Sequence, residues 1–145
     1  MNCSLEIAQV CESIIANISA DFVGLALQNS EGPDVRWHYA AGNSNEKYKR
    51  ISVRYGKGIA GRVISTGSSI TINNFPENIH GKALEYPIML AEKLHYAFAV
   101  PIFLKGVAKG VLLVGRRTNA PITEGEQNVV TQGALTLEGM LVSLF

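Results

Sequence analysis

Residues 55–64 read Tyr-Gly-Lys-Gly-Ile-Ala-Gly-Arg-Val-Ile, and this stretch predicts a glycine-rich turn that opens a short helix ending at Gly67. The first turn of a helix leaves backbone N–H groups without partners inside the helix, and the aligned peptide dipoles make that end attractive to anions. Glycines permit positive φ angles and allow a ligand to approach the backbone closely. Because short glycine-rich motifs are common, two interpretations are open: a small-anion site, or a tight strand-to-helix connection without a ligand.

The surroundings of this stretch are basic, although the chain as a whole is not. The formal net charge is +1, which argues against a general nucleic-acid-binding protein, since those carry a strong basic excess. Between residues 47 and 62, however, no acidic residue occurs. A solvated basic face is the ordinary interpretation of such a run, but beside a helix start it also raises the local concentration of anions. The basic residues of this run are Lys47, Lys49, Arg50, Arg54, Lys57 and Arg62.

The two cysteines, Cys3 and Cys11, both precede the first predicted strand. On one predicted helix they are too distant for a disulfide, and without a CxxC spacing or a neighbouring histidine they do not indicate a metal site. No segment resembles a signal peptide, and no apolar run approaches the roughly 20 residues of a membrane span. We therefore expect a cytoplasmic protein without a membrane-spanning segment, and the length predicts a single domain, 1–145.

Two amphipathic helices are predicted, one near each end of the chain. Residues 4–19 carry apolar side chains at helical spacing, with Ser4 as the N-cap. Thr123 and Glu126 match a capping box, which predicts a helix from there to the C-terminus. The apolar positions that share one face are Ile7, Cys11, Ile14 and Ile18 in the first helix and Val130, Ala134, Leu137, Leu141 and Leu144 in the second.

Five runs of the sequence predict strands, four of them paired as hairpins. The first two are separated by a turn-rich cluster and the last two by Lys105-Gly106, so both pairs are expected to be antiparallel. A short helix at 86–94, with Pro87 in its first turn, follows an irregular segment at 75–85. The predicted strands are 22–27, 35–40, 69–72, 95–104 and 107–115.

Two of these strands carry specific expectations. Period-two alternation places Val35, Trp37 and Tyr39 on one face of the second strand and His38 on the other. Pro101 lacks a backbone N–H, so its strand is expected to have an edge or a bulge at that point. The order of elements predicts an α+β domain with one central antiparallel or mixed sheet. The N- and C-terminal helices are expected on one face, and irregular segments with a ligand pocket on the other.

Three motifs of the chain form a set that is more specific than any one of them. The first is Gly-Ile-Ala-Gly-Arg-Val at 58–63, followed by Ser-Thr-Gly at 65–67. The others are Ala-Val-Pro-Ile at 99–102 and Val-Ala-Lys-Gly-Val-Leu at 107–112. Together with the order of elements, they resemble the GAF domain, a small ligand-binding sensor fold. The resemblance extends from about residue 21 to the end of the chain.

Within that family, further motifs are most similar to the small stand-alone nitrate-receptor proteins. The resemblance implies a nitrate pocket built from backbone N–H groups and apolar side chains, with no cofactor. It also implies a partner, the sensor histidine kinase of a two-component system. The motifs are Arg-Trp-His-Tyr at 36–39, Gly-Asn at 42–43, Tyr-Lys-Arg-Ile at 48–51, Gly-Lys-Gly-Ile-Ala-Gly at 56–61 and Tyr-Pro-Ile at 86–88. Carried over residue by residue, the implied ligand-binding positions are Trp37, Ile59, Ala60, Tyr86 and Ile88.

Nitrate suits such a site on physical grounds. It is planar, singly charged and weakly hydrated, so backbone N–H donors at a helix start can hold it without a buried arginine. An aromatic wall such as Trp37 or Tyr86 can exclude water. Iodide is the expected mimic, because of its size and weak hydration. The segment 75–85 and the helix from Tyr86 are the expected moving parts. Trp37, Tyr86 and Ile88 can also be plain core residues, and the sequence alone leaves this open.

Three other functions are compatible with a GAF domain. Reduction of free methionine sulfoxide needs cysteines in the body of the domain, whereas both cysteines here lie on the first helix, so we expect no enzymatic activity. His38, His80 and His95 form no triad motif. Cyclic-nucleotide binding needs a larger cavity and a signature that the segment before the last helix lacks. A docking module or homodimer formed through the amphipathic terminal helices, with or without a ligand, stays open.

Overall fold

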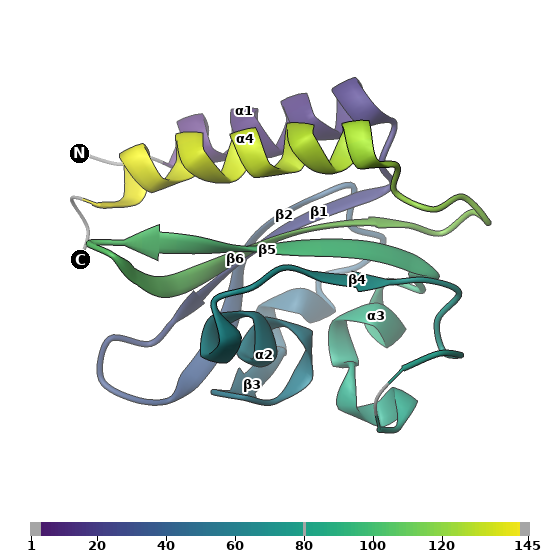
Figure 1. Cartoon of the computed structure of the whole chain (residues 1–145), viewed down its shortest axis with the longest axis horizontal. Helices are drawn as coiled ribbons and strands as arrows, with labels where there is room; N and C mark the ends of the chain where they lie inside the picture. Colours follow the sequence, from purple (N-terminus) through teal and green to yellow (C-terminus); the bar gives the residue numbers. More distant parts are fainter. Residues whose placement is uncertain (1–3, 80, 143–145) are drawn as a thin grey trace.

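The computed structural model describes residues 4–79 and 81–142, and its centre is an antiparallel sheet with helices on both faces (Figure 1). Its strands are β1 (Phe22–Gln28), β2 (Asp34–Ala41), β3 (Ser52–Arg54), β4 (Ile70–Ile72), β5 (Tyr96–Leu104) and β6 (Val107–Arg116). The strand order is β3-β2-β1-β6-β5-β4, and each neighbouring pair is antiparallel. The predicted α+β class and both predicted hairpins are therefore confirmed, whereas β3 was not predicted. Cys3, His80 and Leu144 lie outside the described residues.

Two long helices, α1 (Ser4–Ile18) and α4 (Glu124–Leu141), lie side by side on one face of the sheet, as predicted (Figure 1). The capping box of α4 is also confirmed. The Glu126 N–H donates to Thr123 Oγ1 at 3.2 Å, and the Thr123 N–H donates to Glu126 Oε1 at 2.9 Å. The predicted inner positions of both helices are at most 4% exposed among the described residues. With alternate side chains of the central strands they form one apolar cluster, the helix-side core.

The opposite face of the sheet carries short elements in place of long helices (Figure 1). They are α2 (Gly58–Thr66), α3 (Pro87–Ala91) and two 3-10 helices, η1 (Lys47–Arg50) and η2 (Ala83–Glu85). These elements cover a second apolar cluster, which includes Phe22, Val63 and Met89. We call it the ligand-side core, because the ligand pocket was predicted on this face of the sheet. Irregular segments were predicted on this face. The helix predicted at 86–94 is shorter, and η1 was not predicted.

A β-bulge in β2 overturns the predicted alternation of its side chains. Tyr39 pairs with Leu25 and Trp37 pairs with Ala26, so His38 is an extra residue opposite two consecutive residues of β1. The extra residue reverses the facing of the chain beyond it. Trp37 therefore lies in the ligand-side core, but Tyr39 packs against the helix-side core. The prediction that both aromatic side chains share one face is wrong for Tyr39.

The prediction for Pro101 is confirmed as an edge rather than as a bulge, since Pro101 itself pairs regularly with Val111 of β6. The short strand β4 pairs with β5 only as far as Ala99, so Pro101 lies where β5 has become an edge. A register shift between β5 and β6 follows at Ile102 and Phe103. On this edge the Phe103 N–H donates to Glu138 Oε2 of α4 at 3.0 Å. The proline therefore removes no backbone hydrogen bond between neighbouring strands.

Candidate functional site

The glycine-rich stretch turns sharply from β3 into α2, as predicted, and a close contact requires glycine at Gly61. The Lys57 N–H donates to the Arg54 carbonyl at 2.8 Å, and the Gly56 N–H donates to the Gly61 carbonyl at 3.0 Å. A Cβ at Gly61 would lie 2.2 Å from the Arg54 carbonyl oxygen, so α2 can approach β3 this closely only with glycine there. Gly58 has a φ of +64°. The predicted end of the helix is confirmed as well, because Gly67 is a left-handed C-cap.

The start of α2 offers backbone donors. Within residues 4–79 and 81–142, the N–H groups of Gly58, Ile59 and Ala60 donate to no protein acceptor, and the N-cap Lys57 makes no side-chain capping bond. These groups are the positive end of a helix of nine residues. A small anion is the ligand that such an end accepts most readily.

A small cavity of about 220 Å³ opens at this helix start. It is smaller than the roughly 300–1,000 Å³ of pockets that hold drug-sized ligands, which favours a small ligand over a nucleotide. Its lining joins the helix start to the segment before α3, since the Glu85 carbonyl lies 3.4 Å from the Cβ position of Gly58. The lining residues are Gly56, Lys57, Gly58, Arg62, Gly81, Glu85 and Tyr86.

Arg62 connects the helix start to Tyr86. Its Nη1 donates to the Tyr86 hydroxyl oxygen at 3.1 Å, across the cavity that both residues line. The Tyr86 ring is further fixed by an edge-to-face contact with Phe75, with ring centroids 5.8 Å apart. In the sequence, Arg62 belongs to the basic run and to the motif at 58–63, and it is not among the predicted ligand-binding residues. Its position four residues after Gly58, one helical turn later, was a signal that it shares the face of the helix start.

The five predicted ligand-binding residues come together in space. Trp37, Ile59, Ala60, Tyr86 and Ile88 all belong to the ligand-side core, and each is at most 3% exposed. Tyr86 lines the described cavity, and the other four lie in the packed cluster without lining it. Their role as ligand-binding residues therefore stays a prediction, as does the alternative that they are core residues.

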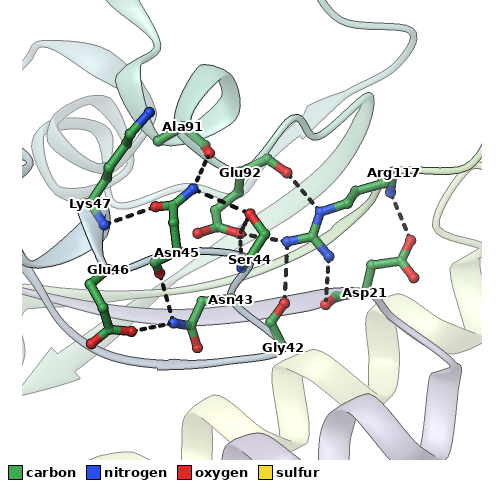
Figure 2. A network of polar contacts seen from close by, with 10 residues as sticks. All are labelled: Asp21, Gly42, Asn43, Ser44, Asn45, Glu46, Lys47, Ala91, Glu92 and Arg117. Atoms are coloured by element: carbon green, nitrogen blue, oxygen red, sulfur yellow. Dashed lines mark hydrogen bonds and ion pairs between the residues drawn. The ribbon is translucent and has the colours of Figure 1, made fainter.

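A polar network fixes the far end of α3 (Figure 2). Glu92 follows α3 and is completely buried, and its Oε1 accepts from Arg117 Nη2 at 2.5 Å and from the Ser44 N–H at 2.8 Å. Arg117 also donates through Nε to the Glu92 carbonyl at 2.8 Å. Asn45 Nδ2 donates to the Ala91 carbonyl at 3.0 Å. Because these residues are distant in sequence, no local motif predicted the network.

A larger cavity, of about 830 Å³, lies elsewhere, where the ends of β1 and β2 meet the β5–β6 turn. Arg36, His38 and Lys109 line it. Burial, with a smaller effect from Arg36, lowers the pKa of His38, so this imidazole is mostly neutral near pH 7. None of the predicted ligand-binding residues lines this cavity. The start of α2 is the better candidate, because backbone N–H donors without acceptors among the described residues, two cations and the predicted residue Tyr86 meet there.

The sequence matches the family model of the GAF domain over residues 6–137. The chain belongs to the GAF domain family. The match spans both cores and all six strands, and it confirms the fold that the motifs implied. No protein of curated function matches the sequence.

Solved structures extend this comparison. A hypothetical protein of Staphylococcus aureus is 34% identical with a TM-score of 0.76, over 82% of this chain and 98% of its own. An NreA protein of S. aureus, mutated in its nitrate binding site, is 32% identical with a TM-score of 0.77, over 85% of this chain and 94% of its own. A free methionine-R-sulfoxide reductase of Neisseria meningitidis is 16% identical with a TM-score of 0.76, over 95% and 77% of the two chains. The likeness to the reductase shows the fold alone.

The described residues offer little to thiol or metal chemistry. Cys11 is 1% exposed in the helix-side core, so the sheet separates it from α2. Burial, with a smaller effect from Glu12, raises the pKa of the Cys11 thiol to about 11, which makes it a poor nucleophile. No group of three or more histidine, cysteine or acidic residues suited to a metal occurs within the described chain. No helix in that part of the chain is long and apolar enough to cross a membrane.

Proposed function

We propose that this GAF domain is a cytoplasmic, non-catalytic receptor for nitrate, which it binds at the start of α2. The observation that carries the proposal is the arrangement at Gly58. Backbone N–H groups that lack acceptors among the described residues open beside a cavity of about 220 Å³, and Lys57 and Arg62 line the same cavity. The similarity to an S. aureus NreA protein with a nitrate binding site supports the choice of anion.

In this proposal, the N–H groups of Ile59 and Ala60 donate to the anion. Tyr86 forms a wall of the cavity, and Trp37 and Ile88 pack behind it in the ligand-side core, which keeps water away from the anion. Arg62 adds positive charge and fixes the Tyr86 hydroxyl. Iodide, which is also weakly hydrated, competes for the same site.

A receptor without catalytic residues reports its state through another protein. We propose a sensor histidine kinase of a two-component system as that partner, whose control adjusts nitrate respiration. Nitrate can change this contact only if the bound and free forms differ in their affinity for the kinase. Tyr86 belongs both to the cavity and to the N-terminus of α3, so α3 is the element that would carry the change. Dimerisation through α1 and α4 stays a prediction.

Calorimetric titration of the purified protein with nitrate tests the receptor proposal, with fluorescence of the single tryptophan, Trp37, followed in parallel. We expect saturable one-site binding that iodide competes with and that chloride and sulfate do not reproduce. Ala60→Pro removes one proposed donor and should abolish binding, whereas Ala60→Gly keeps the N–H and should retain it. Thermal unfolding of both variants controls for misfolding. If Ala60→Pro folds and binds nitrate like the original protein, the backbone-donor model is wrong.

A further inference from the structure

An apolar groove of about 600 Å³ lies beside the candidate site, between η1 and α3. Two leucines dominate it, and both are unusually open to water: Leu84 is 82% exposed and Leu90 is 43% exposed. Exposed apolar surface that is gathered in one place and rimmed by charge is typical of a protein interaction site. The groove is lined by Lys47, Arg50, Ile51, Leu84, Pro87, Leu90 and Ala91.

The rim of the groove is positively charged. Lys47 and Arg50 are exposed, and neither forms an ion pair with a carboxylate in the described parts of the chain. Their neighbour Lys49 is different, because its Nζ lies 2.6 Å from Glu46 Oε1. The carboxylate nearest in sequence to Leu84, that of Glu85, accepts from the Lys82 N–H at 2.8 Å, so it is already engaged. The surface that complements this rim is therefore acidic.

The walls of the groove are tied together and to the candidate site. Asn45 accepts from the Lys47 N–H at 2.8 Å and donates to the Ala91 carbonyl at 3.0 Å, so it joins η1 to the end of α3 (Figure 2). At the other end of α3, Tyr86 stands between Leu84 and Pro87 in the chain and lines the cavity at α2. A displacement of Tyr86 would therefore act on Leu84 and Pro87, its near neighbours in the chain, while Asn45 keeps the end of α3 beside the basic rim.

We propose that this basic-rimmed groove is the docking surface for an acidic segment of the partner kinase, whose apolar side chains pack against Leu84 and Leu90. The inference rests on the proposed function, and it names the surface that the function needs. Carboxylates of the segment pair with Lys47 and Arg50, which are free to do so. By linkage, a ligand at α2 that repositions Tyr86 changes the affinity of the groove for the kinase.

A photo-crosslinking experiment in cells tests the location. A photoreactive phenylalanine analogue is placed at position 84 or 90, and as matched controls at the exposed apolar positions Leu5 and Leu135 of the terminal helices, which are 68% and 53% exposed. We expect adducts with one histidine kinase from positions 84 and 90 and none from the controls. Adducts with the kinase only from the terminal helices, adducts with a protein of another class, or no adducts would each overturn the proposal.

Affinity measurements with the purified kinase and the full chain then test the chemistry. Leu84→Glu and Lys47→Glu should each weaken kinase binding about tenfold or more, whereas Leu135→Glu should change it less than about twofold. Calorimetry with nitrate should give the same affinity for Leu84→Glu and Leu135→Glu. A failure of nitrate binding in the unsubstituted protein therefore counts against the receptor proposal and not against the groove. Equal kinase binding by Leu84→Glu and the unsubstituted protein would overturn the groove. If the unsubstituted protein binds phosphatidylglycerol vesicles and Leu84→Glu does not, the groove binds a membrane surface, and its assignment as a docking surface for a protein segment is wrong.

Discussion

Replacing Arg117 with alanine should destabilise the domain strongly, because the change strands a buried carboxylate. Glu92 is 0% exposed, and its Oε1 would keep only the Ser44 N–H and hydroxyl, at 2.8 and 3.1 Å. Its Oε2 already has no hydrogen-bond partner among the described residues. Removing one member of a buried ion pair costs about 3–5 kcal/mol. Because the Arg117 side chain is 29% exposed, water can enter its place, and we expect about 3 kcal/mol.

Glu92→Gln should be much milder, at about 1 kcal/mol, because it weakens the hydrogen bonds of the network without leaving a charge buried. The double variant should then be more stable than Arg117→Ala alone. Urea unfolding, followed by the fluorescence of Trp37, gives the three free energies of unfolding. The loss for Arg117→Ala corresponds to a fall in melting temperature of roughly 6–12 °C. If Arg117→Ala and Glu92→Gln are equally destabilising, or if the double variant is the least stable of the three, the buried-charge reasoning fails.

Three further outcomes are expected. The Arg116 guanidinium holds the pKa of Glu126 at about 2, against an ordinary value of 4.5, so the pair stabilises the fold fully above pH 4.5 and progressively less as the pH falls toward 2. This pKa shift corresponds to a contribution of at most about 3 kcal/mol to the free energy of unfolding, which partial exposure of the pair reduces to about 1–2 kcal/mol. Glu126→Gln should remove this acid dependence from urea midpoints measured between pH 2 and 5. Gly61→Ala should lower the free energy of unfolding by about 1–3 kcal/mol, because the added methyl group forces α2 away from β3. Gly125→Ala should be neutral or slightly stabilising, because its methyl group would meet nothing within 4 Å. Equal melting temperatures for the two variants would contradict this expectation. In a variant that lacks the other cysteine, Cys11 should not react with a thiol reagent at pH 8 until the protein unfolds. Rapid labelling of the folded variant would show instead that the helix-side core opens easily.

Much of the fold was predictable because its signals are local. Thr123 and Glu126 lie three residues apart, and the capping box they form could be identified without knowing what α4 packs against. The turn into α2 was predictable for the same reason, since glycine at Gly61 and Gly67 matches contacts made within a few residues. Tyr39 was misplaced because alternation assumes a regular strand. The bulge at His38 appears only in the pairing of β2 with β1.

The candidate site was predictable in part, for a related reason. The donors of α2 follow from helix geometry alone, and the family resemblance supplied residues such as Trp37 and Tyr86. The contact of Arg62 with Tyr86 spans 24 residues and the pair of Glu92 with Arg117 spans 25, so no motif joins the partners. Such contacts depend on how the segments over the sheet pack, which hydrophobic periodicity does not specify. The exposed Leu84 is likewise recognisable only after the rest of η2 and α3 has been placed.

The bulge in β2 constrains how this strand can vary in length. Because His38 is the extra residue, it separates a stretch of β2 that serves the ligand-side core from one that serves the helix-side core. Deleting that residue would make Trp37 and Tyr39 consecutive in a regular strand, so each would keep its partner on β1 and its own core. A deletion at position 38 should therefore be tolerated, as should substitutions there. Among related sequences that keep both aromatic residues, we expect them to be either adjacent, where the bulge is absent, or separated by one residue, where it is present.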